Sequence, residues 1–425
     1  MDQMQEVLVL RDVLIPGGRV CDITLSDGKV THVGSSGRAD TICRCGDLLV
    51  LPAGIDMHVH MRDGAQAHKE NWESGTKSAL AGGVTVVVDQ PNTIPSITTG
   101  QLLEKRAHLA EKQSYCHFAI NAGVTTDADL EGMARAGAMA FGETFAGPSS
   151  YGEALSRDDL KSAIGKIRSL DGLITLHAEV VQEGQDTTLA AHDSLRSISG
   201  EREAVRMIQN ISPPGSRIHF CHVSAADTIR DIRRMNSGTV EVTPHHLFLS
   251  YESCTPDDTH AKVNPPIRTE KERKRLWECW DSIDVIASDH APHTIQEKSA
   301  AFQDAPSGIP GVETMIPLLM AEVMEGRISL IDVIEKTSTK PAQILGIEPA
   351  GYQPEMRADF ALYPKTGRKI RAEDLSSKAG WSPYEGKTGV FPTQVIMSGQ
   401  TVYDHGTCIR GDPMWLKGRG YIPEK

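Results

Sequence analysis

The chain has 425 residues, enough for two or three domains of ordinary size, although a barrel of about 250 residues can form a single one. Hydrophobic residues make up 39% and charged residues 24%, as in globular proteins that bury a large core. The formal net charge of −12 argues against a nucleic-acid or anionic-membrane partner, because polyanions are bound through a basic surface. A small anionic substrate remains possible, because it needs only one or two local cations.

The N-terminus and the cysteines favour a cytoplasmic protein. Residues Met1 to Glu6 lack the basic and apolar regions of a secretory signal, and apolar runs such as Val84–Val88 are too short to span a membrane. Of eight cysteines, only Cys43 and Cys45 lie close together, and their spacing fits neither a disulfide framework nor a zinc ribbon. We therefore expect reduced thiols in the cytoplasm.

The first 51 residues are expected to form short β-strands separated by turns. Gly17-Gly18 and Asp27-Gly28 are typical turn pairs. The predicted strands are Glu6–Arg11, Asp22–Leu25, Lys29–Val33 and Leu48–Leu51.

After Pro52 the pattern changes to short β-branched runs that alternate with helix-like stretches. The predicted strands are Ile55–Val59, Val84–Val88, His117–Asn121, Ala138–Phe141, Leu173–Leu176, Ile218–Cys221, Thr239–Val242 and Asp284–Ala287. The predicted helices include Lys69–Ala81, Gly100–Glu111, Asp127–Ala136, Arg157–Ser169, Leu195–Ile211, Ala225–Met235 and Glu270–Trp280, with more between Glu313 and Leu345. Eight such units predict an α/β fold, a (β/α)8 TIM-type barrel with its active site at the C-terminal ends of the strands.

From Gly346 onward the chain returns to β-like runs. They are Phe360–Tyr363, Thr393–Met397 and Gln400–Tyr403. We therefore expect a small β-sandwich-like domain built from both termini, residues 1–51 plus 346–425, beside a barrel formed by residues 52–345.

Histidines occur at the ends of several predicted barrel strands. His58 and His60 are two residues apart on one strand, so their side chains point the same way and can share one metal. His177 and His222 close two further strands, and Asp289 follows the eighth. This set of nitrogen and oxygen donors suits Zn²⁺ and is difficult to explain by structural roles alone.

The motifs around these residues resemble the amidohydrolase superfamily, and their wording is closest to the dihydroorotase family. The resemblance covers nearly the whole chain and rests on residues 52–62, 90–93, 243–247, 264–268 and 289–293. It implies the reversible, metal-dependent cyclisation of N-carbamoyl-L-aspartate to L-dihydroorotate in pyrimidine biosynthesis. A possible homodimer is also implied by the family.

The catalytic step can be argued from the residues as well. A bound metal lowers the pKa of water from 15.7 towards roughly 7 and polarises an amide carbonyl. Asp289, placed against the metals, can take the proton from the attacking water and deliver it to the leaving nitrogen. His245 and His246 also follow a strand end, but we expect structural or supporting roles for them.

The substrate carries a carboxylate, and Arg62 is the best candidate to bind it, because a guanidinium matches a carboxylate in geometry. The alternative for Arg62 is a surface salt bridge to Asp63 or Glu70. By resemblance the other substrate-binding residues are His60, Asn92, Asn264, His293, Ser307 and Gly308, the last two through their backbone. Asn92 could instead only shape the turn from Pro91 to Pro95.

The fourth strand departs from the pattern of many relatives, which carry a carbamylated lysine there. No lysine occurs between Lys112 and Lys161, and Glu143 stands at the corresponding strand end. Two close divalent cations need bridging anionic charge, so we expect two Zn²⁺ per chain bridged by the Glu143 carboxylate. The alternative is a solvent-facing Glu143 above a mononuclear site, and Mn²⁺ or Co²⁺ could replace Zn²⁺.

Two other functions remain open at this stage. The chain could hydrolyse another cyclic amide, as dihydropyrimidinases, hydantoinases and allantoinases do, although the Phe-Lys bridging motif of hydantoinases is absent. It could also be an inactive dihydroorotase-like subunit that scaffolds aspartate carbamoyltransferase. The segments Glu252–Pro265 and Thr294–Pro310 are long enough to close over a substrate.

Overall fold

An eight-stranded parallel barrel forms the centre of the molecule. The computed structural model describes residues 7–35, 37, 39–145, 155–236 and 238–423. The barrel strands are β6 (Gly54–Val59), β7 (Val84–Asp89), β8 (His117–Ile120), β9 (Phe141–Phe145), β10 (Leu173–His177), β11 (Arg217–Phe220), β12 (Thr239–Val242) and β13 (Val285–Ile286). Strands β6 to β8 and β9 to β13 pair in chain order, and single parallel bridges from Ala122 to Phe141 and from Val59 to His290 close the ring. The predicted barrel is confirmed.

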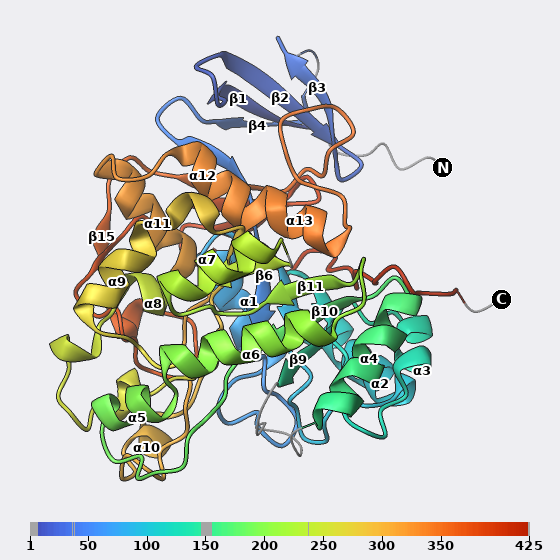
Figure 1. Cartoon of the computed structure of the whole chain (residues 1–425). Coiled ribbons are helices and arrows are strands. Elements are labelled where there is room, and N and C mark those ends of the chain that lie inside the picture. Colours follow the sequence, from blue (N-terminus) through green and yellow to red (C-terminus); the bar gives the residue numbers. More distant parts are fainter. Residues whose placement is uncertain (1–6, 36, 38, 146–154, 237, 424–425) are drawn as a thin grey trace.

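Helices surround the barrel, as Figure 1 shows. Those between or after its strands are α1 (Trp72–Ala81), α2 (Gly100–Gln113), α3 (Leu130–Ala136), α4 (Arg157–Ser169), α6 (Ile198–Ile211), α7 (Ala226–Met235), α9 (Glu270–Trp277), α11 (Met315–Met324), α12 (Leu330–Ile334) and α13 (Lys340–Leu345). Every residue of β6 and β7 is buried, because side chains fill the barrel on one face and helices cover the other. None of the helices in the described part of the chain is long and apolar enough to cross a membrane.

Shorter helices lie in the loops after the strands. They are α5 (Leu189–Leu195), α8 (Pro244–Phe248) and α10 (Ile295–Lys298). The predicted helix Leu195–Ile211 is confirmed from Ile198 onward, but it begins three residues later than predicted, because the chain turns at Arg196 and Ser197 between α5 and α6. The Ser197 hydroxyl accepts a hydrogen bond from the Gly200 N–H and so begins a new helix, α6.

The fourth barrel strand is also displaced from its predicted position. The prediction was Ala138–Phe141, whereas β9 runs from Phe141 to Phe145. The apolar residues before Phe141 led to the predicted position. Strand β9 itself contains Gly142 and Glu143, and neither residue fits the apolar pattern that predicts a buried strand. Glu143 therefore lies within the strand, not beyond its end.

Strands from both chain ends pair with each other beside the barrel. One sheet has the order β3-β2-β1-β4, from β1 (Leu8–Leu14), β2 (Val20–Ser26), β3 (Lys29–Gly34) and β4 (Thr41–Arg44). A second has the order β19-β18-β17-β14-β5, from β5 (Leu49–Pro52), β14 (Phe360–Tyr363), β17 (Gln394–Met397), β18 (Gln400–Asp404) and β19 (Thr407–Cys408). Strand β14 is antiparallel to both β5 and β17, and Figure 1 shows the first sheet at one end of the molecule. The composite domain boundaries stay a prediction.

Four short strands in the N-terminal and C-terminal regions beside the barrel were not predicted from the sequence. Strands β4, β15 (Arg368–Lys369), β16 (Thr388–Gly389) and β19 are short and polar, so they lack an alternating pattern. The predicted Glu6–Arg11 begins at Leu8 in the structure, and Glu6 lies outside the described residues.

Candidate metal centre and active site

The predicted metal ligands converge at the C-terminal end of the barrel. His58 lies in β6 and His60 directly after it, while Glu143 lies in β9 and His177 ends β10. His222 and Asp289 follow β11 and β13. All six residues are buried, each with no more than 6% of its surface exposed. Strand order alone therefore brings residues 230 positions apart into one cluster, since parallel strands end at the same rim.

One group of ligand atoms surrounds Asp289. The His60 Nε2 atom lies 3.1 Å and the His58 Nε2 atom 3.6 Å from Asp289 Oδ1. The same His58 nitrogen is 3.6 Å from Glu143 Oε2. Within the described part of the chain His58 Nε2 has no hydrogen-bond partner, although it is fully buried. An unpaired nitrogen between two carboxylates is what a divalent cation would satisfy.

A second group surrounds the other oxygen of Glu143. Glu143 Oε1 lies 2.7 Å from His177 Nδ1 and 2.5 Å from His222 Nε2. The two imidazole nitrogens are only 3.2 Å apart. Glu143 thus contacts both groups through different oxygens, and the donor set fits two neighbouring divalent cations.

The histidines also control the charge of both carboxyl groups. Burial alone would raise the pKa of Glu143, but His222, His177 and His58 outweigh burial and hold that pKa well below its usual range. In the same way His58 and His60 lower the pKa of Asp289 against the effect of burial. Both groups are therefore carboxylates at neutral pH, the form that binds cations.

Two buried carboxylates and one amide contact ring nitrogens of three of these histidines and so fix the orientation of the rings. Glu241 Oε1 lies 3.0 Å from His58 Nδ1, and Glu179 contacts His177 Nε2. Asn92 Oδ1 lies 2.7 Å from His60 Nδ1. Such outer contacts select the tautomer that leaves the other nitrogen free for a metal.

The sequence prediction missed Glu241 and Glu179. The available signals were a glutamate inside an apolar strand and a second acidic residue two positions after His177. Cys221 joins His58 and Glu241 in another group of close ligand atoms, but Glu241 already binds the His58 and His219 rings.

A cavity of about 460 Å³ opens directly above this cluster. It is lined by all seven residues predicted to bind substrate: His60, Arg62, Asn92, Asn264, His293, Ser307 and Gly308. It is also lined by Glu143, His177 and Asp289, whereas His58 and His222 lie deeper. One cavity therefore unites the predicted metal and substrate residues.

Arg62 is buried in this cavity and is not a surface residue. Its Nε donates to the Pro292 carbonyl at 3.3 Å, and its NH2 atom lies 3.2 Å from His293 Nε2. Among the described residues no carboxylate lies within 4.0 Å of its guanidinium, so the alternative salt bridge to Asp63 or Glu70 is wrong. Burial lowers the pKa of Arg62 to about 10, and it remains charged at neutral pH. A buried cation of this kind favours an anionic ligand.

The other predicted substrate residues differ in how freely they face the cavity. Asn264 Oδ1 lies 2.9 Å from His192 Nε2, which leaves its amide nitrogen available. The Gly308 N–H donates to the Lys262 carbonyl at 3.0 Å, so it is already used. A Cβ at Gly308 would lie 2.5 Å from the Ala291 carbonyl oxygen, and its φ is +143°, so only glycine fits here.

Polar, charged and aromatic residues that were not predicted from the sequence also lie at or near the cavity. Gln66, Phe145 and Arg196 line it, and Lys69 Nζ lies 3.2 Å from the His293 ring. Lys69 was expected to belong to a helix, but α1 begins only at Trp72.

Several site residues adopt a left-handed backbone conformation. The φ angles are +52° at Arg62, +35° at His222 and +47° at Asp289. Non-glycine residues in this region are strained and persist where the surroundings hold them, often at functional sites.

The two long segments after the strands are tied to each other. Lys298 is fully buried, and its ammonium donates to the carbonyls of Thr259, Lys262 and Pro306. Nearby, His246 lies 2.8 Å from the Thr243 hydroxyl and 3.1 Å from the Pro265 carbonyl, as expected for a structural histidine.

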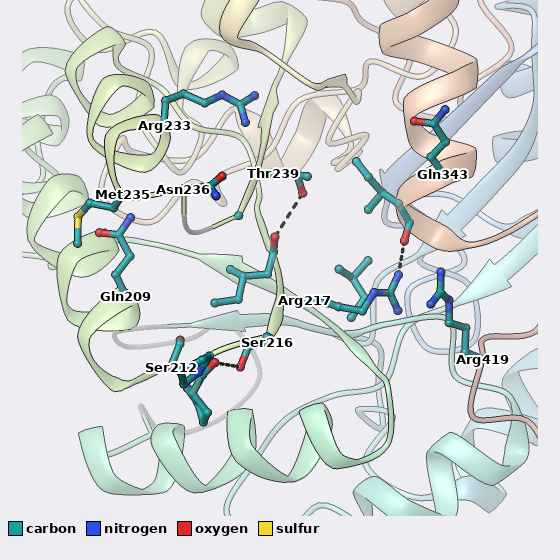
Figure 2. A pocket seen from close by; sticks show the side chains of 17 residues that line it. Gln209, Ser212, Ser216, Arg217, Arg233, Met235, Asn236, Thr239, Gln343 and Arg419 are labelled. Atoms are coloured by element: carbon teal, nitrogen blue, oxygen red, sulfur yellow. Dashed lines mark hydrogen bonds between the residues drawn. The ribbon is translucent and has the colours of Figure 1, made fainter.

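A second cavity, of about 710 Å³, lies at the opposite end of the barrel (Figure 2). It is lined by the first residues of three strands, Leu173, Arg217 and Thr239. Arg217 donates to the carbonyls of Asp171 and Ile344 at 3.0 and 2.5 Å. The Arg217 guanidinium therefore binds backbone carbonyls. Among the described residues, those that line this cavity include no cluster of catalytic groups.

Comparison with known proteins agrees with this geometry. The model of the amidohydrolase family matches residues 49–366. A protein of Halobacterium salinarum named dihydroorotase is 37% identical over 410 residues, covering 94% of this chain and 97% of that protein. Another dihydroorotase, from Methanosarcina mazei, is 36% identical and covers 95% of each chain.

Solved structures with the same fold include hydantoinases. The L-hydantoinase of Arthrobacter aurescens superposes with a TM-score of 0.90 at 24% identity, covering 97% of this chain and all of that one. The D-hydantoinase of a Thermus species gives a TM-score of 0.87 at 20% identity, covering 97% of this chain and 99% of that one. At these identities the likeness concerns the fold. With the family match and the close relatives, the chain belongs to the amidohydrolase family and, within it, to the dihydroorotases.

Proposed function

We propose that the chain catalyses the reversible cyclisation of N-carbamoyl-L-aspartate to L-dihydroorotate. The observation that carries this proposal is the buried Arg62 guanidinium beside His293, in the same cavity as the ligand cluster. L-Dihydroorotate bears a carboxylate on its ring, whereas hydantoin and dihydrouracil do not. A buried cation that has no carboxylate partner among the described residues favours the acidic substrate over the neutral ones.

The six ligands His58, His60, Glu143, His177, His222 and Asp289 would hold two Zn²⁺ ions, with Glu143 contacting both. Bound there, the cations supply polarisation of the amide carbonyl and a water of lowered pKa. The nitrogen and carboxylate donors suit Zn²⁺. Glu143 supports the bridge, because its two oxygens face different ligand groups.

Asp289 would serve as the catalytic acid and base. In the hydrolytic direction its carboxylate takes a proton from the attacking water and gives it to the ring nitrogen that leaves. The lowered pKa of Asp289 keeps it ionised at neutral pH, and only the ionised form can take up a proton. In the cyclising direction the same group removes the proton from the attacking ureide nitrogen.

Residues on the far wall of the cavity would hold the substrate in place. Arg62 and His293 bind the carboxylate, and the free amide nitrogen of Asn264 donates to a carbonyl of the ring or ureide. Asn92 contributes by orienting His60, which its contact with Nδ1 supports. Ser307 and Gly308 close the wall through their backbone.

The proposal includes a place in pyrimidine biosynthesis and in the cytoplasm. The eight cysteines are all free, which is compatible with a reducing compartment. A homodimer stays a prediction.

The direct test is turnover by the purified, metal-loaded enzyme. We expect hydrolysis of L-dihydroorotate and its formation from N-carbamoyl-L-aspartate, with far lower kcat/KM for dihydrouracil, hydantoin and allantoin. Preference for a neutral substrate would favour another cyclic-amide hydrolase. No turnover of any of them at full metal content would favour a scaffold subunit.

The bridge requires a separate test of metal content. Glu143→Ala should lose at least one of two metals per chain and most activity, while Glu143→Asp keeps part of both. Wild-type activity should not depend on bicarbonate, because no carbamate has to form. Glu131→Ala, at an exposed surface pair with Lys166, is the matched control and should keep both metals. One metal per chain, unchanged in Glu143→Ala, would contradict the bridge.

A further inference from the structure

A lysine outside the predicted site contacts the back of His293. Lys69 Nζ lies 3.2 Å from His293 Nδ1 and 2.8 Å from Glu297 Oε1. The Lys69 side chain is only 13% exposed. On the opposite edge of the same ring, His293 Nε2 lies 3.1 Å from the Ser307 carbonyl and 3.2 Å from Arg62 NH2.

These contacts determine which ring nitrogen carries the proton. A lysine ammonium has only donors, so the His293 Nδ1 that it contacts must accept and cannot bear a proton. A neutral imidazole then carries its proton on Nε2, where the Ser307 carbonyl can accept it. Burial, followed by the charges of Arg62 and Lys69, lowers the pKa of His293, which keeps the ring neutral.

The acidic neighbour of His293 does not reverse this assignment. Glu297 Oε2 lies 3.6 Å from His293 Nδ1, beyond hydrogen-bond distance. Lys69 Nζ lies closer, at 3.2 Å from His293 Nδ1 and 2.8 Å from Glu297 Oε1. Glu297 therefore forms an ion pair with the Lys69 ammonium, and the ammonium donates a hydrogen bond to the His293 ring.

The consequence appears on the cavity side of the ring. With the proton on Nε2, His293 donates to the Ser307 carbonyl and cannot accept from Arg62, whose NH2 group lies 3.2 Å away. The Arg62 N–H that faces the ring is therefore left for a carboxylate, the acceptor that best matches a guanidinium. With the proton on Nδ1, His293 Nε2 would instead accept from Arg62 and repel a carboxylate oxygen.

We propose that Lys69 is a positioning residue that fixes His293 as the Nε2–H tautomer and thereby makes the cavity selective for substrates with a carboxylate. The inference rests on the proposed function for its substrate, but its effect on the ring is independent of turnover. Lys69 itself does not line the cavity, so it acts through His293.

The first test is kinetic, on the metal-loaded full chain. Lys69→Met should raise KM for L-dihydroorotate about tenfold, as for one charge-assisted hydrogen bond, and change kcat by less than about twofold. Lys69→Arg, which also has only donors, should recover most of the wild-type KM. Lys77→Met is the matched control, because Lys77 pairs with Glu73 on the surface of α1. Metal content should stay unchanged in all three variants.

The second test reads the tautomer directly. In ¹⁵N-labelled histidine spectra, the His293 signals, assigned by their loss in His293→Gln, should show a protonated Nε2 in the wild type and a mixture in Lys69→Met. A wild-type Nδ1–H tautomer, or an unchanged tautomer and KM in Lys69→Met, would overturn the inference. If the wild type has the Nε2–H tautomer but does not turn over dihydroorotate, the proposed function fails and the tautomer assignment stands.

Discussion

The two ends of the barrel both carry a cavity lined by arginines, yet the surroundings of these arginines differ. At the N-terminal end Arg217 binds two carbonyls, Arg419 pairs with Asp171 and Arg233 pairs with Asp284. At the C-terminal end Arg62 has no such carboxylate among the described residues, and carboxylates and imidazoles face one another across a shared space. The N-terminal cavity is the larger of the two. A buried cation beside a cluster of carboxylates and imidazoles therefore indicates function better than cavity size does.

This comparison predicts that substitutions at the C-terminal end change activity and spare stability, and that those at the N-terminal end do the reverse. The largest effect is expected for Asp289→Asn. An amide cannot shuttle a proton, so kcat should fall by about 10³-fold or more, while the melting temperature stays close to that of the wild type. Turnover assays with metal analysis measure this, since weak ligation through the amide oxygen should retain most metal. Near-normal turnover would exclude Asp289 as the acid and base.

Substitution of Arg62 should give the next largest effect, on substrate binding. Lys in place of Arg62 keeps the charge but loses the bidentate geometry, so KM should rise by about 100-fold with little loss of metal. Arg230→Lys, on the surface of α7 beside Asp227, is the control and should behave as the wild type. If KM is unchanged in Arg62→Lys, the carboxylate of the substrate binds elsewhere.

At the N-terminal end, acid should destabilise the fold through His117, the first residue of β8. Burial lowers the pKa of His117 to about 4, and its Nδ1 accepts from the Met414 N–H at 2.9 Å. Because the folded pKa lies below the unfolded value of about 6.5, the stability is present above pH 6.5 and is lost as the pH falls towards 4, by about 3 kcal/mol in all.

Urea unfolding at pH 7 and pH 4.5 measures this loss. His117→Gln should show a smaller decrease than the wild type, whereas His405→Gln, at a largely exposed site, should show the wild-type decrease. Equal decreases in all three proteins would assign the acid sensitivity to other groups.

The smallest effect is expected for Arg217→Met, in the cavity of Figure 2. The variant leaves two carbonyls without their donor and should lower the free energy of unfolding by about 1–3 kcal/mol. Part of this cost is offset, because burial and the nearby Arg419 already lower the pKa of Arg217. The kcat/KM for dihydroorotate should not change. A large loss of kcat/KM at full stability would mean that this end of the barrel also serves the reaction.

Much of the site could be predicted because its signals are local. His58 and His60 form a pair at the end of one strand, and His177 and His222 each close a predicted strand. Once eight strand–helix units are recognised, the barrel rule places all strand ends at one rim. Of the seven expected substrate residues, Arg62 was argued from its chemistry and the others from motifs that resemble a known family, and all seven line one cavity.

The remaining features depend on contacts between distant segments. Glu241 orients His58 across 183 residues, and Lys69 reaches His293 across 224. No local pattern marks these residues. A glutamate inside a strand gives no sign of a partner, and Lys69 was predicted only as the first residue of a helix. Sequence periodicity and the strand-end residues determined the barrel and its candidate metal ligands, because both depend on short-range spacing. Only the closed barrel decided which side chains contact those histidines and carboxylates, and which tautomer each histidine adopts. The physical reason is that hydrogen-bond partners are neighbours in space and can be far apart in the sequence.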